Sequence, residues 1–163
     1  MGDVVLRRGQ PADHEAAVAV WLASRASRPG GHPASAQREA YVRGQMHKPD
    51  AFLVIAEDAG AVVGMALAMQ GLADDGAGPP VPGLCFIGMV FVAPDRWGQG
   101  IGGRIVDSVL AEVWSRGYGR AQLWTHASNE RAQRLYESRG FRRTGREQDH
   151  ELGDRIVQYE RGR

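Results

Sequence analysis

The chain has 163 residues, a length that suits a single domain able to bury a core of its own. Hydrophobic residues make up 43% and charged residues 24%, which predicts a soluble globular protein rather than a disordered one. The net charge of +1 argues against nucleic-acid binding, and a single cysteine, Cys85, excludes a disulfide framework or a cysteine-based zinc site. No apolar run is long enough to span a membrane, and the N-terminal segment lacks the apolar core of a signal peptide. We therefore expect one cytoplasmic domain over residues 1–163, with no membrane partner.

The first half of the chain predicts a strand, two helices and a hairpin. Ser35 is the expected N-cap of the second helix, and Gly60 lies in the turn between the hairpin strands. Glycine and proline dominate residues 71–83, which predicts a loop. The predicted strands cover 4–7, 51–57 and 61–69, and the predicted helices cover 12–27 and 36–47.

The second half alternates strands with helices. Residues 84–92 are nearly all apolar, which indicates a central strand buried on both faces. Asn129 is the expected N-cap of a helix that ends before Gly140. The further predicted elements are a helix from Ile101 to about residue 116, a strand over 121–125, a helix over 130–139, and strands from Phe141 and over 155–159. This order predicts an α/β fold, with a mixed sheet and helices on both of its faces.

The most informative segment is the glycine-rich turn between the strand at 84–92 and the helix from Ile101. The first turn of a helix has unpaired backbone N–H groups, and glycine lets a ligand approach them closely. Together these features predict an anion site that suits a phosphate or pyrophosphate. Gly98, Gly100 and Gly103 also match the G-x-G-x-x-G pattern of dinucleotide-binding proteins. Against that reading, four residues separate the glycines from the strand, and no acidic residue stands at 122–124.

Two motifs resemble the GNAT family of N-acetyltransferases. Residues 97–102 (WGQGIG) fill the family's acyl-CoA loop pattern, Arg/Gln-x-x-Gly-x-Gly/Ala, from its second place onward. Trp97 stands where Arg or Gln is usual, and Arg96, one residue earlier, is a candidate substitute. Residues 129–141 (NERAQRLYESRGF) resemble the family's N-x-x-A-x-x-L-Y-E-x-x-G-F. The resemblance implies a single GNAT domain with a mostly antiparallel sheet of about seven strands, helices on both faces and splayed central strands.

The resemblance also implies acetyl transfer from acetyl-CoA to an amine. In the family the pantetheine arm pairs with the strand before the loop, and the pyrophosphate lies on the amides of the glycine turn. Carried over, this implies that acetyl-CoA contacts Val90, Val92, Trp97, Gly98, Gln99, Gly100, Ile101, Gly102, Gly103, Asn129 and Tyr136.

Three residues of the second motif share one face of the predicted helix. Asn129, Ala132 and Tyr136 are spaced i, i+3 and i+7. By the resemblance, Tyr136 is the general acid that protonates the departing thiolate, which a phenol can do within hydrogen-bond reach. The alternative is a tyrosine that only packs in the core. Asn129 is expected both to cap the helix and to touch the cofactor.

The general base is not evident from the sequence. Many family members carry a glutamate on the strand before the loop, but the strand at 84–92 has no acidic residue, and Gly88 and Met89 stand there instead. An alkylamine has a pKa near 10, so a group must accept its proton. His126, at a strand end, and Glu57, on the hairpin, are candidates, while exposed side chains without a role, a water relay or an already neutral amine are the alternatives.

We expect an N-acetyltransferase that moves acetyl from acetyl-CoA to a primary amine of a small molecule, directly in a ternary complex and without a metal. Two alternatives remain open: acetylation of a protein or peptide α-amine, and a non-catalytic acyl-CoA-binding sensor. Residues 28–47 and 71–83, which would set acceptor specificity, match no motif. Dimers are common in the family, but no residue here specifies a homodimer interface.

Overall fold

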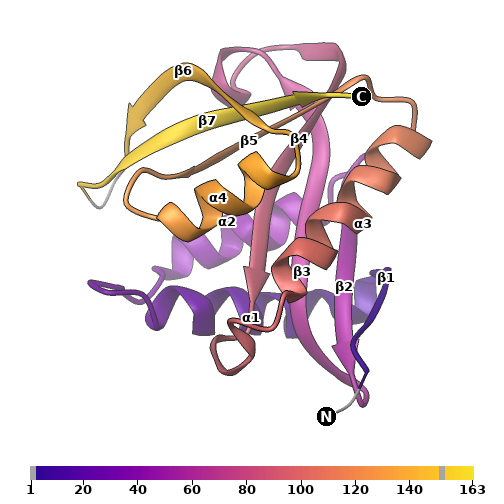
Figure 1. The fold of residues 1–163 in the computed structure, drawn as a ribbon, viewed down its shortest axis with the longest axis vertical. Helices are drawn as coiled ribbons and strands as arrows, with labels where there is room; N and C mark the ends of the chain where they lie inside the picture. The colour runs from indigo at the N-terminus through magenta and orange to yellow at the C-terminus, as the bar shows by residue number, and fades with distance from the viewer. Residues whose placement is uncertain (1–2, 151–152) are drawn as a thin grey trace. The chain divides into compact units, whose positions relative to one another are not determined.

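The computed structural model describes residues 3–150 and 153–163, and Figure 1 shows its ribbon. The chain divides into two compact units. The first unit comprises Met1–Met69 and Met89–Val109, and the second comprises Gln70–Gly88 and Leu110–Arg163. Seven strands form one sheet in the order β1-β2-β3-β4-β5-β7-β6. The strands are β1 (Val5–Arg8), β2 (Phe52–Asp58), β3 (Ala61–Leu72), β4 (Pro80–Val92), β5 (Arg120–His126), β6 (Arg142–Asp149) and β7 (Arg155–Gly162). The helices are α1 (His14–Ala26), α2 (Ala36–Met46), α3 (Ile101–Ser115) and α4 (Glu130–Ser138), with short 3-10 turns at Pro11–Asp13, Asp74–Gly76 and Pro94–Arg96.

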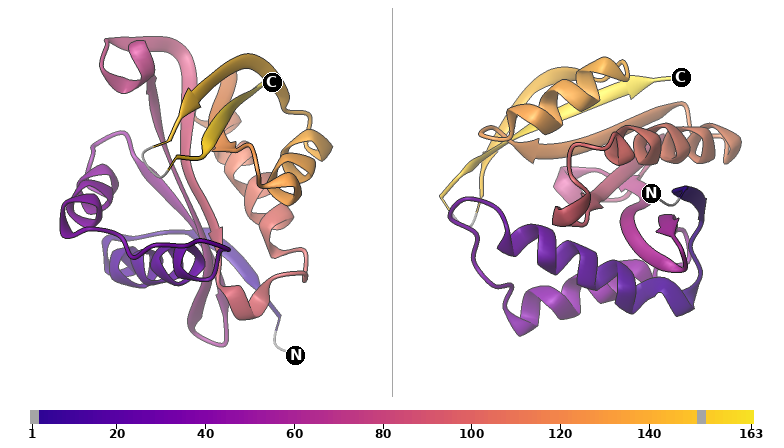
Figure 2. Two further views of the ribbon diagram at one scale, coloured as in Figure 1. Left: turned by 90° about the vertical axis from the view of Figure 1, so that its left-hand side faces the viewer. Right: turned by 60° about the horizontal axis from the view of Figure 1, so that its bottom comes forward.

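The first unit is built on the antiparallel strands β1, β2 and β3. β2 is buried along nearly its whole length, and β1 and β3 pair with its two edges. α2 begins where expected, since the Ser35 hydroxyl accepts a hydrogen bond from the Arg38 amide at 3.0 Å. α1 and α2 pack side by side, as the right-hand view of Figure 2 shows. The apolar face of α1 includes the buried Val18 and Trp21.

The second unit is built on β5, β7 and β6. β5 pairs with β7, and β7 pairs with β6, in antiparallel register. The Asn129 side chain caps α4 by accepting a hydrogen bond from the Ala132 amide at 3.1 Å, as predicted. α4 ends before Gly140, whose φ of +85° is the left-handed conformation expected just after a helix.

The prediction of a loop over residues 71–83 was wrong in its extent. β3 runs on to Leu72 and β4 starts at Pro80, so only a short turn separates the strands. The Gln70 side-chain amide explains why, because it donates to the carbonyls of Val81 at 2.8 Å and Leu84 at 3.1 Å. Gly71 is needed there for another reason: a Cβ on it would lie 2.5 Å from the Leu84 side chain.

The prediction that residues 84–92 are buried on both faces holds only for the first half of the strand. Leu84, Cys85 and Ile87 are buried, whereas Gly88 is exposed and residues 89–92 are half-buried. The parallel ladder between β4 and β5 ends at the pair Phe86–Gln122, although β4 continues to Val92. The second half of β4 is therefore less covered than an ordinary central strand.

Candidate functional site

The glycine turn has the backbone conformation of an anion site. Gly98 and Gly100 have φ values of +83° and +77°, which strain any residue with a side chain. The Arg104 amide donates to the Gly100 carbonyl at 3.3 Å, so the amides of residues 101–103 lie ahead of the helical ladder of α3. A Cβ on Gly100 would meet no atom within 4 Å, so open space adjoins the turn. These amides and the positive end of a long helix fit the phosphates of an acyl-CoA.

Trp97 has a role that its sequence position did not reveal. The indole Nε1 donates a hydrogen bond to the Val92 carbonyl at 2.8 Å, and 41% of the residue is exposed. Trp97 thus ties the glycine turn back to the end of β4.

Arg96, the candidate substitute for the usual Arg or Gln, is held by an internal carboxylate, which disfavours that role. Its Nη1 lies 2.6 Å from Oδ2 of Asp58, a carboxylate that is only 6% exposed. Both residues belong to the first unit, where Arg96 fastens the start of the glycine turn to the end of β2. Its charge is therefore used within the protein.

In the second unit, α4 and the end of β5 form one hydrogen-bonded piece. The Gln133 side-chain amide donates to the carbonyls of His126 at 3.1 Å and Ala127 at 2.8 Å. Tyr136 is 7% exposed, and its ring packs against Phe141 at 5.8 Å between centroids. His126, Asn129 and Tyr136 are therefore held by the same local framework.

His126 has a carboxylate partner that the sequence did not indicate. Its Nδ1 lies 2.9 Å from Oδ2 of Asp154, and the same oxygen accepts a hydrogen bond from the Ser128 hydroxyl at 2.9 Å. The Arg155 amide donates to the other oxygen of Asp154 at 2.8 Å. Burial raises the pKa of Asp154, but these three hydrogen bonds outweigh it and hold the pKa below its usual range. Asp154 is therefore ionised at neutral pH.

A family model described as acetyltransferase (GNAT) family matches residues 17–141, which is more than half of the chain. The chain belongs to the GNAT family. Mycothiol acetyltransferase of Thermobispora bispora is 35% identical over 89 residues, covering 55% of this chain and 29% of that protein. A second curated relative, an uncharacterised N-acetyltransferase of Archaeoglobus fulgidus, matches over 37% of its length. The matched segments thus span about a third of these relatives.

Two solved structures show the same fold at low sequence identity. The ribosomal-protein-S18-alanine N-acetyltransferase of Escherichia coli superposes with a TM-score of 0.75 at 19% identity, covering 98% of this chain and 94% of that one. PaiA N-acetyltransferase of Thermoplasma acidophilum, solved in complex with coenzyme A, gives a TM-score of 0.70 at 15% identity, covering 99% of each chain. The mostly antiparallel GNAT sheet predicted from the sequence is thereby confirmed.

Glu57, the other candidate base, lies on the hairpin as expected but is part of an ion pair. It lies one residue before the end of β2, and its carboxylate is 2.5 Å from Nε of Arg7 on β1. Arg7 also makes a two-pronged ion pair with Asp13, at 2.8 Å for each contact. Glu57 is thus part of an ion-pair network between β1, β2 and the start of α1, which disfavours it as a proton acceptor.

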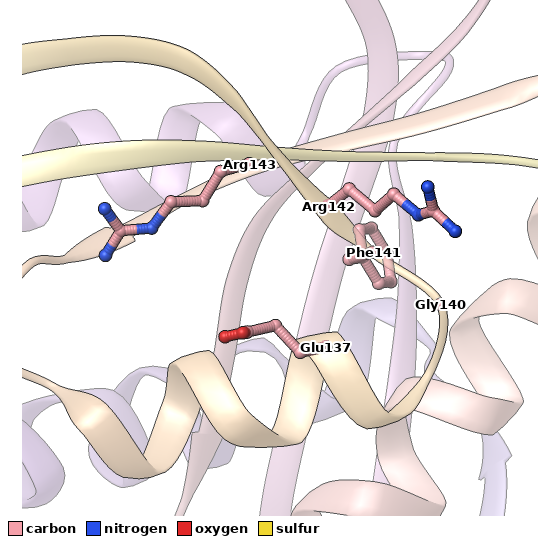
Figure 3. A pocket seen from close by; sticks show the side chains of 5 residues that line it. All are labelled: Glu137, Gly140, Phe141, Arg142 and Arg143. Atoms are coloured by element: carbon pink, nitrogen blue, oxygen red, sulfur yellow. The ribbon is translucent and has the colours of Figure 1, made fainter.

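A pocket between the C-terminal end of α4 and the start of β6 contains none of the predicted site residues. It is lined by Glu137, Gly140, Phe141, Arg142 and Arg143, and Figure 3 shows the two guanidinium groups pointing in opposite directions. The Arg143 guanidinium donates to Gln133 at 2.6 Å and to the Tyr159 hydroxyl at 3.4 Å. The bond to Tyr159 raises the pKa of Arg143. We assign this pocket a structural role, because Arg143 is occupied by internal partners.

The described part of the chain contains no cluster of three or more His, Cys, Asp or Glu side chains able to hold a metal ion. Among the helices within residues 3–150 and 153–163, none is long and apolar enough to cross a membrane.

Proposed function

We propose that this GNAT protein is an N-acetyltransferase that moves acetyl from acetyl-CoA directly to a primary amine of a small molecule. The observation that carries the proposal is the glycine turn, where left-handed Gly98 and Gly100 lead into the unpaired amides of α3. The coenzyme A complex of the Thermoplasma acidophilum protein supports the choice of cofactor.

The proposed reaction assigns each step to groups of this chain. The amides of residues 98–103 hold the pyrophosphate, and the Val90 and Val92 backbones hold the pantetheine arm. The amine nitrogen attacks the thioester carbonyl carbon, forming a C–N bond and breaking the C–S bond. Tyr136 gives its proton to the departing thiolate, and His126 accepts the proton that the amine loses. Asn129 caps α4 and contacts the cofactor.

The preference for a small acceptor rests on two segments folded against neighbouring strands. In the first unit, the Arg28 guanidinium lies 5.6 Å from the centre of the Phe91 ring on β4. In the second unit, Asp75 of the β3–β4 connection accepts hydrogen bonds from Arg146 at 2.9 Å and Gln148 at 2.7 Å. An anchored connection is less free to move aside for a polypeptide, which supports a small acceptor. The Escherichia coli protein named above acts on a ribosomal protein, so a peptide acceptor is the second candidate.

The test is release of free CoA from acetyl-CoA, measured with a thiol reagent against a panel of small primary amines and a panel of peptides with free N-termini. We expect turnover with small amines, and a loss of about 10²-fold or more in kcat for Tyr136→Phe. Tyr159→Phe is the matched control, because Tyr159 is fully buried, its ring lies 6.3 Å from that of Tyr136, and it has no proposed catalytic role. Turnover with peptides alone would mean that the acceptor is a peptide and not a small molecule. No turnover with either panel would favour the alternative of a non-catalytic acyl-CoA-binding module.

A further inference from the structure

We infer that Asp154 is a positioning residue that holds His126 with its neutral ring protonated on Nδ1, so that Nε2 is the atom that accepts the amine proton. That Nε2 accepts a proton from the amine rests on the proposed function. The contact between Asp154 and His126 rests only on observations within the second unit.

The carboxylate of Asp154 is held in place by hydrogen bonds other than its contact with His126. One oxygen accepts from the Ser128 hydroxyl, two residues beyond His126, and the other accepts from the Arg155 amide. The His150 amide donates to the Asp154 backbone carbonyl at 2.6 Å, which also fixes the main chain. A carboxylate held by hydrogen bonds from separate residues differs from an exposed ion pair, whose two side chains are each ordered only by the other.

The ionised state of Asp154 determines the tautomer of His126. An ionised carboxylate is only an acceptor, so a hydrogen bond of 2.9 Å requires a proton on Nδ1. In the neutral ring, Nε2 then carries the lone pair, and the hydrogen bond at Nδ1 selects this tautomer. The same carboxylate stabilises the imidazolium that forms when Nε2 takes up a proton.

The surroundings of His126 keep the ring oriented. Its carbonyl accepts from Gln133 and from the Asn129 amide, so the backbone at the end of β5 is pinned to α4. The His150 ring meets the His126 ring edge-on at 4.9 Å between centroids. With one quarter of its side chain exposed, His126 is accessible to a substrate.

The other charged groups of this region pair elsewhere. Arg155, the neighbour of Asp154, forms ion pairs with Glu147 at 2.9 Å and Asp149 at 3.8 Å. Asp154 is therefore the carboxylate that faces the His126 ring in the described part of the second unit, and His150 is the titratable ring packed against it.

The step moves one proton from the nitrogen of the attacking neutral amine to Nε2 of His126, while Tyr136 supplies one proton to sulfur. Exchange with solvent then returns a proton to Tyr136 and removes one from His126, so the protons balance. Asp154 neither gains nor loses a proton. Its effect is on the orientation and tautomer of the ring, so removing Asp154 lowers kcat without removing the base itself.

The first experiment reads the tautomer directly, without substrate. Long-range ¹⁵N–¹H spectra of the full-length protein at a pH where His126 is neutral report which ring nitrogen carries hydrogen. We expect Nδ1–H in the wild type and loss of that preference in Asp154→Asn. Asp149→Asn is the matched control, because Asp149 faces Arg155 instead of the ring. A neutral His126 protonated on Nε2 in the wild type overturns the inference.

The second experiment separates this inference from the proposed function. Given turnover with a small amine, Asp154→Asn should lower kcat at least tenfold with little change in the KM for acetyl-CoA. Asp154→Glu, which keeps a carboxylate, should restore part of the rate. An unchanged kcat in Asp154→Asn overturns the positioning role and leaves the transfer reaction standing. If no amine is acetylated, the proposed function fails. The tautomer experiment still tests whether Asp154 holds the proton of His126 on Nδ1.

Discussion

In the glycine turn the groups proposed to bind the cofactor are backbone amides from one continuous segment. At the end of β5 the proposed base and its partner are side chains from distant parts of the chain. The turn needs glycine because Gly98 and Gly100 adopt left-handed φ values, so its chemistry leaves a mark in the sequence. His126 and Asp154 stand 28 positions apart and meet because β5 and β7 pair with His126 opposite Ile156. A backbone site can thus be read from a motif, while a side-chain site depends on strand register.

The largest effect on turnover should come from removing the His126 side chain at the end of β5. His126→Gln should lower kcat about 100-fold, because the amine loses its proton acceptor, while the affinity for acetyl-CoA stays within a factor of two or so. Steady-state kinetics together with isothermal titration of acetyl-CoA checks both quantities. Equal losses in turnover and in cofactor affinity would mean that the two regions are not separable by function.

Gly100→Ala should give the opposite pattern. The Cβ has space, but the left-handed backbone opposes it, so the turn should shift and acetyl-CoA affinity should fall about tenfold, or about 1.4 kcal/mol. Titration calorimetry measures the loss. Gly60→Ala is the matched control, since Gly60 has a φ of +83° and open space but lies in the β2–β3 turn. If both variants weaken binding alike, the effect reports general destabilisation and the turn is not the cofactor site.

The two helix caps allow a finer test of the same comparison. Ser35→Ala and Asn129→Ala each remove a side chain that accepts from a helix amide, and each should cost about 1 kcal/mol of unfolding free energy. Denaturant melts measure that loss. Only Asn129→Ala should also raise the KM for acetyl-CoA, because Asn129 is proposed to touch the cofactor. Identical kinetics for the two variants would mean that Asn129 only caps the helix and does not contact the cofactor.

The smallest effect concerns stability against pH. Asp154 has a folded pKa below its ordinary value of 3.8, so its hydrogen bonds contribute stability that is fully present above that value. The contribution is lost as the pH falls through the folded pKa. Melts at several pH values should show the wild type more stable than Asp154→Asn near neutrality, with the difference shrinking below pH 3.8. A constant difference would mean that the carboxylate keeps its usual pKa.

What could be predicted from the sequence was local. Ser35, Asn129 and Gly140 mark helix ends through short-range geometry, and the glycine turn follows from the same kind of reasoning. The extent of β3 and β4 could not be predicted, because their glycine and proline residues are typical of a loop. The side chain of Gln70 on β3 holds the two strands together there through hydrogen bonds to carbonyls of β4.

The missed contacts at the site have a similar origin. The bond from Trp97 to the Val92 carbonyl spans a turn whose path the residue types do not specify. The pairing of Arg96 with Asp58 depends on where β2 ends in space. Such contacts are set by tertiary placement, which no periodicity or motif in this chain encodes.

The most direct test of the central claim, that the glycine turn holds an acyl-CoA, is a thermal shift with acetyl-CoA, CoA and NAD side by side. A ligand at a hundredfold excess over its Kd stabilises the folded state by about 2.7 kcal/mol, which is easily seen. We predict a higher Tm with acetyl-CoA and with CoA, a smaller shift for both in Gly100→Ala, and none with NAD. A shift with NAD alone, or no shift with either CoA species, would contradict the assignment of the turn and with it the proposed acetyl transfer.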